Sequence, residues 1–152
     1  MVDHLGILSV GWTALSGAGA CERVPRCVAE APRSHLGQSS RLEAAKTVRW
    51  DWEMFGVGDT LRMKEIEENR RIVIGWDSDH TSVGWNFEPR GQDRTLVNIS
   101  TWGFRGNDDE VLVQAIDSKG GYTMVLAGLK AWLEYGVELN PVRDQFPDGN
   151  PT

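Results

Sequence analysis

Two carboxylates, Asp51 and Glu53, lie in a stretch where charged residues alternate with the apolar Trp50 and Trp52. This alternation predicts a strand whose two faces differ, with both carboxylates on the polar face. Two carboxylates on one face can act as a general acid and a general base. They also suit a solvated outer face that pairs with cations of a neighbouring strand. The second interpretation is favoured, because the apolar face is the expected interior, and no catalytic residue is predicted.

A second candidate group is the acidic sequence that ends at His80, Asp77-Ser78-Asp79-His80. A calcium-binding loop that began here would need glycine at its sixth position, where Ser82 stands. The residue types favour a polar hairpin turn instead. The three histidines, at positions 4, 35 and 80, are too scattered to form a Ser-His-Asp or Cys-His set. The sequence therefore predicts no metal site and no cofactor.

Tryptophan is unusually abundant, with seven residues against four phenylalanines and two tyrosines. Five of them fall among the predicted strands, namely Trp50, Trp52, Trp76, Trp85 and Trp102. Indole rings are large and rigid, so this set can line a cavity for a hydrophobic or aromatic ligand. The same rings can instead fill the core of a strongly bent sheet, and the sequence leaves both interpretations open.

Composition limits the classes of function. The 152 residues suit a single domain. The 22 acidic and 16 basic residues give a net charge of −6, which disfavours a nucleic-acid binder because such proteins neutralise phosphates with basic side chains. No apolar run approaches the ~20 residues that a membrane-spanning helix needs. We expect a cytoplasmic protein without nucleic-acid or membrane partners.

From residue 46 onward, short turns separate stretches in which apolar and polar residues alternate. The five predicted strands cover residues 48–52, 61–66, 72–76, 83–87 and 95–104. Ile66 falls out of phase with Leu61 and Met63, which predicts a bulge or bend near Glu65. Successive strands joined in this way predict an antiparallel meander.

A helical pattern follows the strands. Asn107 or Asp108 can cap its start, where nearby acids are favourable. The pair Gly120-Gly121 is expected to weaken or break the helix. A second stretch over residues 122–135 carries an apolar stripe, and Gly136 is a plausible cap at its end.

The pattern predicts an α+β fold in which a bent antiparallel sheet wraps around one long C-terminal helix. The helix stripe must be buried against the inner face of the sheet. A single helix rarely fills a curved sheet completely, so we expect a cavity between the two. The candidate cavity residues are Trp50, Trp52, Met63, Ile74, Trp76, Trp85, Phe87, Trp102, Leu126 and Leu129.

Four segments carry a family resemblance. They are residues 48–59 (VRWDWEMFGVGD), 72–76 (IVIGW), 95–99 (TLVNI) with Gly103-Phe104, and 121–136 (GYTMVLAGLKAWLEYG). In order and spacing the chain resembles the SRPBCC superfamily, also called START-like or helix-grip. Within it, the chain is most similar to the branch named after the activator of the heat-shock-protein-ninety ATPase. The resemblance implies a deep hydrophobic cavity between the sheet and the C-terminal helix.

The N-terminal part departs from that family pattern, in which a strand and two short helices come first. Residues 1–35 are rich in alanine, glycine, serine and arginine and show no sustained period. We expect an irregular or atypical segment over residues 1–35, the helix-grip domain over 36–147 and a tail over 148–152. Our hypothesis for residues 1–35 is a misassigned start or an out-of-frame stretch.

The main functional hypothesis is binding of a hydrophobic small molecule in the predicted cavity, without an assigned reaction. One alternative is an interaction module that docks to a chaperone ATPase in a stress response, as the name of the branch implies. Another is an enzyme of the cyclase or hydrolase kind, with a cavity carboxylate such as Glu53. The chain is expected to be a monomer or a homodimer.

Overall fold

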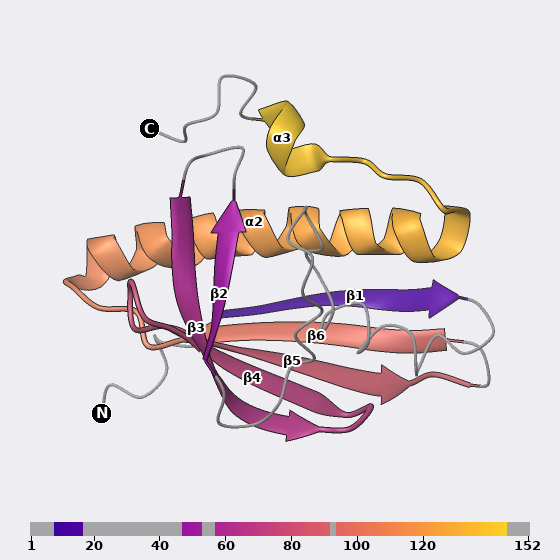
Figure 1. The fold of residues 1–152 in the computed structure, drawn as a ribbon, viewed down its shortest axis with the longest axis horizontal. Coiled ribbons are helices and arrows are strands. Elements are labelled where there is room, and N and C mark those ends of the chain that lie inside the picture. Colours follow the sequence, from indigo (N-terminus) through magenta and orange to yellow (C-terminus); the bar gives the residue numbers. More distant parts are fainter. Residues whose placement is uncertain (1–7, 17–46, 53–56, 92–93, 146–152) are drawn as a thin grey trace.

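The computed structural model describes residues 8–16, 47–52, 57–91 and 94–145. They form a six-stranded sheet and a long helix that lies across it, followed by a short helix (Figure 1). The strands are β1 (Leu8–Ser16), β2 (Thr47–Trp52), β3 (Val57–Glu67), β4 (Arg71–Trp76), β5 (Ser82–Pro89) and β6 (Arg94–Trp102). The helices are α2 (Asp108–Tyr135) and α3 (Pro141–Gln145). This arrangement confirms the predicted α+β helix-grip fold.

The strand order is β1-β6-β5-β4-β3-β2, and every neighbouring pair is antiparallel. Strands β2 to β6 follow one another in space as they do in sequence, which confirms the predicted meander. The first strand of the chain joins the far edge of the sheet, where Val10 is paired with Ile99 of β6.

Strand β1 corrects the expectation that residues 1–35 are irregular. Its sequence LSVGWTALS contains glycine, alanine and serine, which have little strand preference. Leu8, Val10 and Trp12 nevertheless alternate with smaller residues, and pairing with β6 overrides the weak local preference. Residues 17–46 lie outside the described residues, so the domain boundary at 35/36 stays a prediction.

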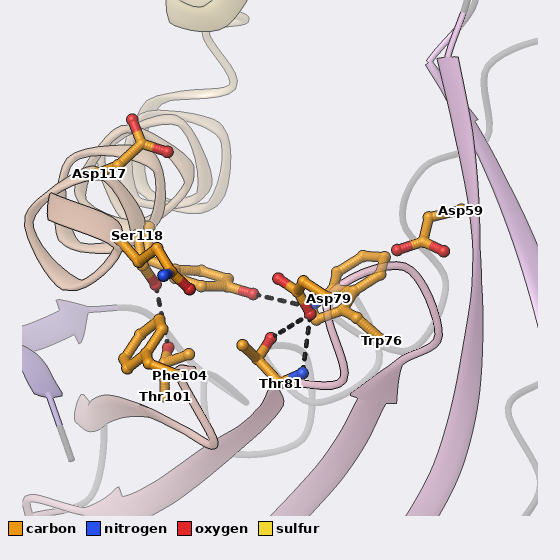
Figure 2. A pocket seen from close by; sticks show the side chains of 10 residues that line it. Asp59, Trp76, Asp79, Thr81, Thr101, Phe104, Asp117 and Ser118 are labelled. Atoms are coloured by element: carbon orange, nitrogen blue, oxygen red, sulfur yellow. Dashed lines mark hydrogen bonds between the residues drawn. The ribbon is translucent and has the colours of Figure 1, made fainter. Parts of the chain in front are cut away.

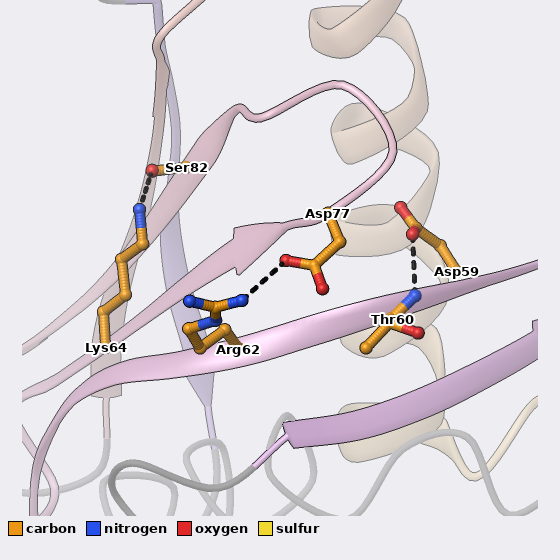
Figure 3. A network of polar contacts seen from close by, with 6 residues as sticks. All are labelled: Asp59, Thr60, Arg62, Lys64, Asp77 and Ser82. Atoms are coloured by element: carbon orange, nitrogen blue, oxygen red, sulfur yellow. Dashed lines mark hydrogen bonds and ion pairs between the residues drawn. The ribbon is translucent and has the colours of Figure 1, made fainter.

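The predicted bulge in the third strand is confirmed. Met63 is paired with Ile74, and the next pair joins Glu65 to Val73, so that Lys64 is the extra residue. A bulge bends its strand and restores the alternation one residue later, which brings Ile66 back to the core side. The Lys64 side chain crosses Gly75 on the outer face and donates a hydrogen bond of 2.7 Å to Ser82 Oγ (Figure 3).

The core lies between the inner face of the sheet and α2. Alternate residues of β3 to β6 point into it, because side chains of a strand alternate between the two faces. The cluster consists of Leu61, Met63, Ile72, Ile74, Val83, Trp85, Phe87, Val97 and Ile99, with Leu126 from the helix. Each of these side chains is almost completely removed from solvent.

Helix α2 is continuous over 28 residues, which corrects the expected break at Gly120-Gly121. Each glycine costs about 1 kcal/mol in a helix interior. Contacts on both sides of the pair offset that cost: Ser118 donates a hydrogen bond to Thr101, and Tyr122 packs edge-on against Trp85. Among the described residues, neither helix is long and apolar enough to cross a membrane.

The predicted ends of the helix are confirmed. Asn107 and Glu110 form a capping box, in which each side chain bonds to the backbone N–H of the other residue. At the other end Gly136 has φ 66°, and its N–H donates to the carbonyl of Trp132. These caps satisfy backbone groups that the helix itself leaves without partners.

Candidate functional site

A pocket of about 280 Å³ lies between the first half of α2 and the turn that joins β4 to β5 (Figure 2). The sheet and its turns supply one wall, and one face of the helix supplies the other. The lining residues are Asp59, Trp76, Asp79, Thr81, Thr101, Phe104, Gln114, Asp117, Ser118 and Tyr122. Its volume is just below the range of about 300–1,000 Å³ that is usual for ligand sites.

Two aromatic side chains from distant parts of the chain meet in this pocket. The indole Nε1 of Trp76 on β4 donates a hydrogen bond of 3.4 Å to the Tyr122 hydroxyl on α2. The Tyr122 ring also makes a T-shaped contact with Trp85, with a centroid distance of 5.9 Å. These contacts connect the helix to two adjacent strands and fix the direction of the hydroxyl group.

The Tyr122 hydroxyl is held in its neutral form. Burial raises the pKa of Tyr122 to about 12, an effect that the hydrogen bond from Trp76 opposes and the charge of Asp79 reinforces. A neutral phenol is both a donor and an acceptor. Since its only hydrogen bond among the described residues is the one it accepts from Trp76, its own proton is available to a ligand.

Two aspartates that line the pocket are held in place by short polar contacts. Asp79 Oδ1 accepts hydrogen bonds of 2.8 Å from both the N–H and the hydroxyl of Thr81 (Figure 2). This is an Asx-type turn, which confirms the predicted polar turn over residues 77–80. Asp59 accepts from the N–H of Thr60 at 2.6 Å and from the Ser78 hydroxyl at 2.5 Å. Both carboxylates are therefore fixed in position.

The helix side of the pocket is polar. Ser118 Oγ donates to Thr101 Oγ1 at 3.2 Å and joins α2 to the last strand of the sheet. One turn earlier, Gln114 Nε2 donates to the carbonyl of Arg105 at 2.8 Å, in the loop that enters the helix. The pocket therefore offers aromatic rings, hydroxyl groups and carboxylates.

Seven of the predicted cavity residues lie on the inner side of the sheet. Met63, Ile74, Trp85, Phe87 and Leu126 belong to the packed core, and Trp76 and Leu129 pack against it. Of these, only Trp76 lines the pocket of Figure 2. The structure thus fills much of the expected cavity with side chains. A role of these residues in ligand binding stays a prediction.

Trp102 is a correction, because it lies on the outer face of the sheet. The alternation of β6 directs Thr101 toward α2, so its neighbour Trp102 points to the other side. There the Trp102 ring covers Gly84, where a Cβ atom would come within 3.1 Å of a ring carbon. The side chains of Trp50 and Trp52 lie outside the described residues, as does the whole of Glu53.

Sequence reasoning missed Tyr122, Ser118 and Asp79 as site residues. Tyr122 lies on the same helical stripe as Leu126, and Ser118 precedes it by one turn, so helical spacing could have placed both on the sheet side. The contact between Trp76 and Tyr122 joins residues 46 positions apart and had no signal in the sequence. Within the described part of the chain, no group of three or more potential metal ligands is present.

No family model matches the chain, and no curated protein matches it in sequence. Several solved structures share its fold. The protein SSP2350 from Staphylococcus saprophyticus superposes with a TM-score of 0.69 at 22% identity, over 88% of this chain and 96% of that one. The Aha1 dimer from Colwellia psychrerythraea gives a TM-score of 0.65 at 11% identity, over 86% and 97% of the two chains.

A third similar structure is DynU16, a putative protein in the dynemicin biosynthetic locus. It has a TM-score of 0.67 at 18% identity, and the match covers 88% of this chain but 49% of DynU16. At these identities the likenesses show that the chain shares its fold with these proteins.

Proposed function

We propose that the chain binds a small molecule in the pocket between α2 and the β4–β5 turn. The observation that carries this proposal is the pairing of Trp76 with Tyr122 across the pocket, with the hydroxyl proton of Tyr122 available. Ligand pockets commonly combine aromatic walls with a few fixed polar groups that orient the ligand. This pocket has both.

The ligand would bind mainly by burial of its apolar part. The rings of Trp76, Phe104 and Tyr122 supply the apolar surface. The Tyr122 hydroxyl and the Asp79 carboxylate would orient its polar part. This refines the hydrophobic ligand that the sequence suggests into one with an apolar body and a polar group.

Native mass spectrometry of the purified full chain, compared with the denatured mass, tests the proposal. We expect an adduct that is released on denaturation. Ser118→Phe places a ring in the pocket and should abolish the adduct, while Lys119→Phe places the same ring on the exposed side of the helix and should retain it. An adduct that survives Ser118→Phe, or a wild-type chain that carries none when purified from its natural source, would contradict the proposal.

A second candidate function is an interaction module. The observation that supports it is the exposure of apolar side chains on the first half of α2. Leu112, Val113 and Ile116 are 58%, 67% and 62% exposed. Apolar side chains that are exposed together commonly mark a protein interface. The similar Aha1 structure is a dimer, so the partner proposed here is a second copy of this chain.

Light scattering over a range of protein concentrations tests this second candidate. We expect a concentration-dependent dimer that Ile116→Glu dissociates, with Lys119→Glu as the matched control on the same helix. A monomer at all concentrations would rule out the dimer. If that monomer still changed the rate of a chaperone ATPase, the chaperone alternative would be favoured instead.

A further inference from the structure

All the charged residues among the described lining of the pocket are acidic. Three of its lining residues, Asp59, Asp79 and Asp117, are aspartates, and none of the described lining residues is a lysine, arginine or histidine. In the described part of the chain, none of the three carboxylates forms an ion pair. Nearby Asp77 does so, with Arg62 at 3.4 Å (Figure 3). Among the described residues, no cationic side chain is therefore paired with the aspartates of the pocket.

The position of two of these charges is fixed relative to the aromatic walls. In the view of Figure 2, Asp59 and Asp79 lie on either side of the Trp76 indole, whereas the Asp117 side chain points away from the other labelled side chains. Asp79 uses one oxygen, Oδ1, for both bonds to Thr81, and its second oxygen accepts no hydrogen bond from the described residues. That oxygen is free to accept one from a ligand.

The aromatic walls carry the same electrostatic preference. The face of an indole or phenol ring is the negative end of its quadrupole and attracts a cation placed above it. Trp76, Tyr122 and Phe104 all line the pocket. The Tyr122 hydroxyl stays protonated, because burial and the Asp79 charge raise its pKa to about 12. The ring therefore adds a donor rather than a second negative charge.

We propose that the pocket selects a small organic cation, an amine or quaternary ammonium group, held between the Asp59 and Asp79 carboxylates and the Trp76 and Tyr122 rings. This inference rests on the proposed function, since it names the chemical class of the ligand for the same pocket. An anion of the same shape is excluded by the fixed aspartates, and a neutral molecule gains only the burial of its apolar part.

Three probes of nearly equal shape test the inference on the full chain. Choline is a cation, 3,3-dimethylbutan-1-ol is its neutral analogue, and 3,3-dimethylbutanoate is an anion. Binding is followed by the NMR signal of the Trp76 indole N–H, identified by its loss in Trp76→Phe. We expect saturable shifts with choline, a dissociation constant at least about tenfold higher for the alcohol, and no saturation with the anion.

Asp79→Asn is the decisive variant. Asparagine keeps the Oδ1 acceptor for Thr81 and removes only the charge. We expect it to raise the choline dissociation constant about tenfold and to leave that of the alcohol unchanged. Asp77→Asn is the matched control, because Asp77 belongs to the same turn but does not line the pocket, and it should alter neither constant.

The outcomes separate the two proposals. Equal binding of choline and the alcohol, or an Asp79→Asn variant that binds choline as the wild type does, would overturn the cation preference and leave the pocket as a binding site. Absence of any shift at Trp76 with choline would also overturn the inference. The adduct experiment with Ser118→Phe would then decide the proposed function by itself.

Discussion

The two halves of α2 meet the sheet in different ways. The second half packs closely: Leu126 is 2% exposed, and Leu129 and Leu133 lie against the same core. The first half has no buried residue, and its Ser118 donates a hydrogen bond to Thr101 of the sheet. One half therefore stabilises the fold, and the other leaves space beside the sheet in which a site is formed.

The largest effect that this comparison predicts is at Leu126. Leu126→Ala should lower the free energy of unfolding by about 2–5 kcal/mol, because it removes buried methyl groups and leaves a cavity. Urea denaturation measures the loss. The neighbouring Val125→Ala is the control, since Val125 is 43% exposed and should cost less than about 1 kcal/mol. Equal losses in both variants would show that the second half of α2 does not anchor the core.

Tyr122 lies at the junction of the two halves, and its raised pKa should make the stability of the fold depend on pH in the alkaline range. Its pKa is raised from 10.0 to about 12 in the folded chain, so the folded state retains a proton that the unfolded chain releases. The resulting stability is fully present below pH 10 and is lost as the pH rises toward 12. A difference of two pKa units corresponds to about 2–3 kcal/mol in the free energy of unfolding.

Comparison of wild type with Tyr122→Phe, by denaturation between pH 9 and 12, isolates this contribution. The variant should lose less stability over that interval than the wild type does. Tyr135→Phe serves as the control, because Tyr135 is 74% exposed and should leave the alkaline loss unchanged. Parallel pH profiles for wild type and Tyr122→Phe would show that the phenol is not buried.

A smaller effect is expected at the start of the first half. Asn107→Ala removes the side-chain acceptor for the Glu110 N–H and should cost about 1 kcal/mol. Asn107→Ser keeps a capping oxygen and should restore most of the loss. Thermal denaturation followed by circular dichroism measures both. If alanine and serine behave alike, the capping box contributes nothing to the first half.

The smallest effect concerns the glycine between the halves. A Cβ atom at Gly120 meets no other atom within 4 Å, so Gly120→Ala should raise stability by about 0.5–1 kcal/mol. The ligand-induced shift at the Trp76 signal should not change, because the helix is already continuous there. A loss of stability would indicate that the two halves are separate helices in solution.

Much of the fold was predictable from local patterns, and most of the site was not. The strands β2 to β6, the phase slip at Ile66 and the caps at Asn107 and Gly136 were predicted from local signals, and each was confirmed. Strand β1 and the continuity of α2 at Gly120 were not predicted. Both depend on long-range contacts that outweigh weak or unfavourable local preferences.

The site escaped prediction for a related reason. Selection of aromatic residues by type found Trp76 but put Trp102 on the wrong face of the sheet, although Trp102 is out of phase with Val97 and Ile99 of the same strand. Two other residues of the pocket, Tyr122 and Asp79, are an ordinary tyrosine and an aspartate in a turn. Only the three-dimensional arrangement brings them together, so their types alone could not have identified them.

The pairing of β1 with β6 has a kinetic consequence. Its paired residues are separated by 93 positions for Leu8 with Thr101 and by 78 positions for Ser16 with Arg94. Closing so long a loop costs more chain entropy than forming the adjacent hairpins of β3 to β6. During synthesis the first strand leaves the ribosome long before its partner exists. We therefore expect the meander to assemble first, with the edge of β6 exposed until β1 docks last.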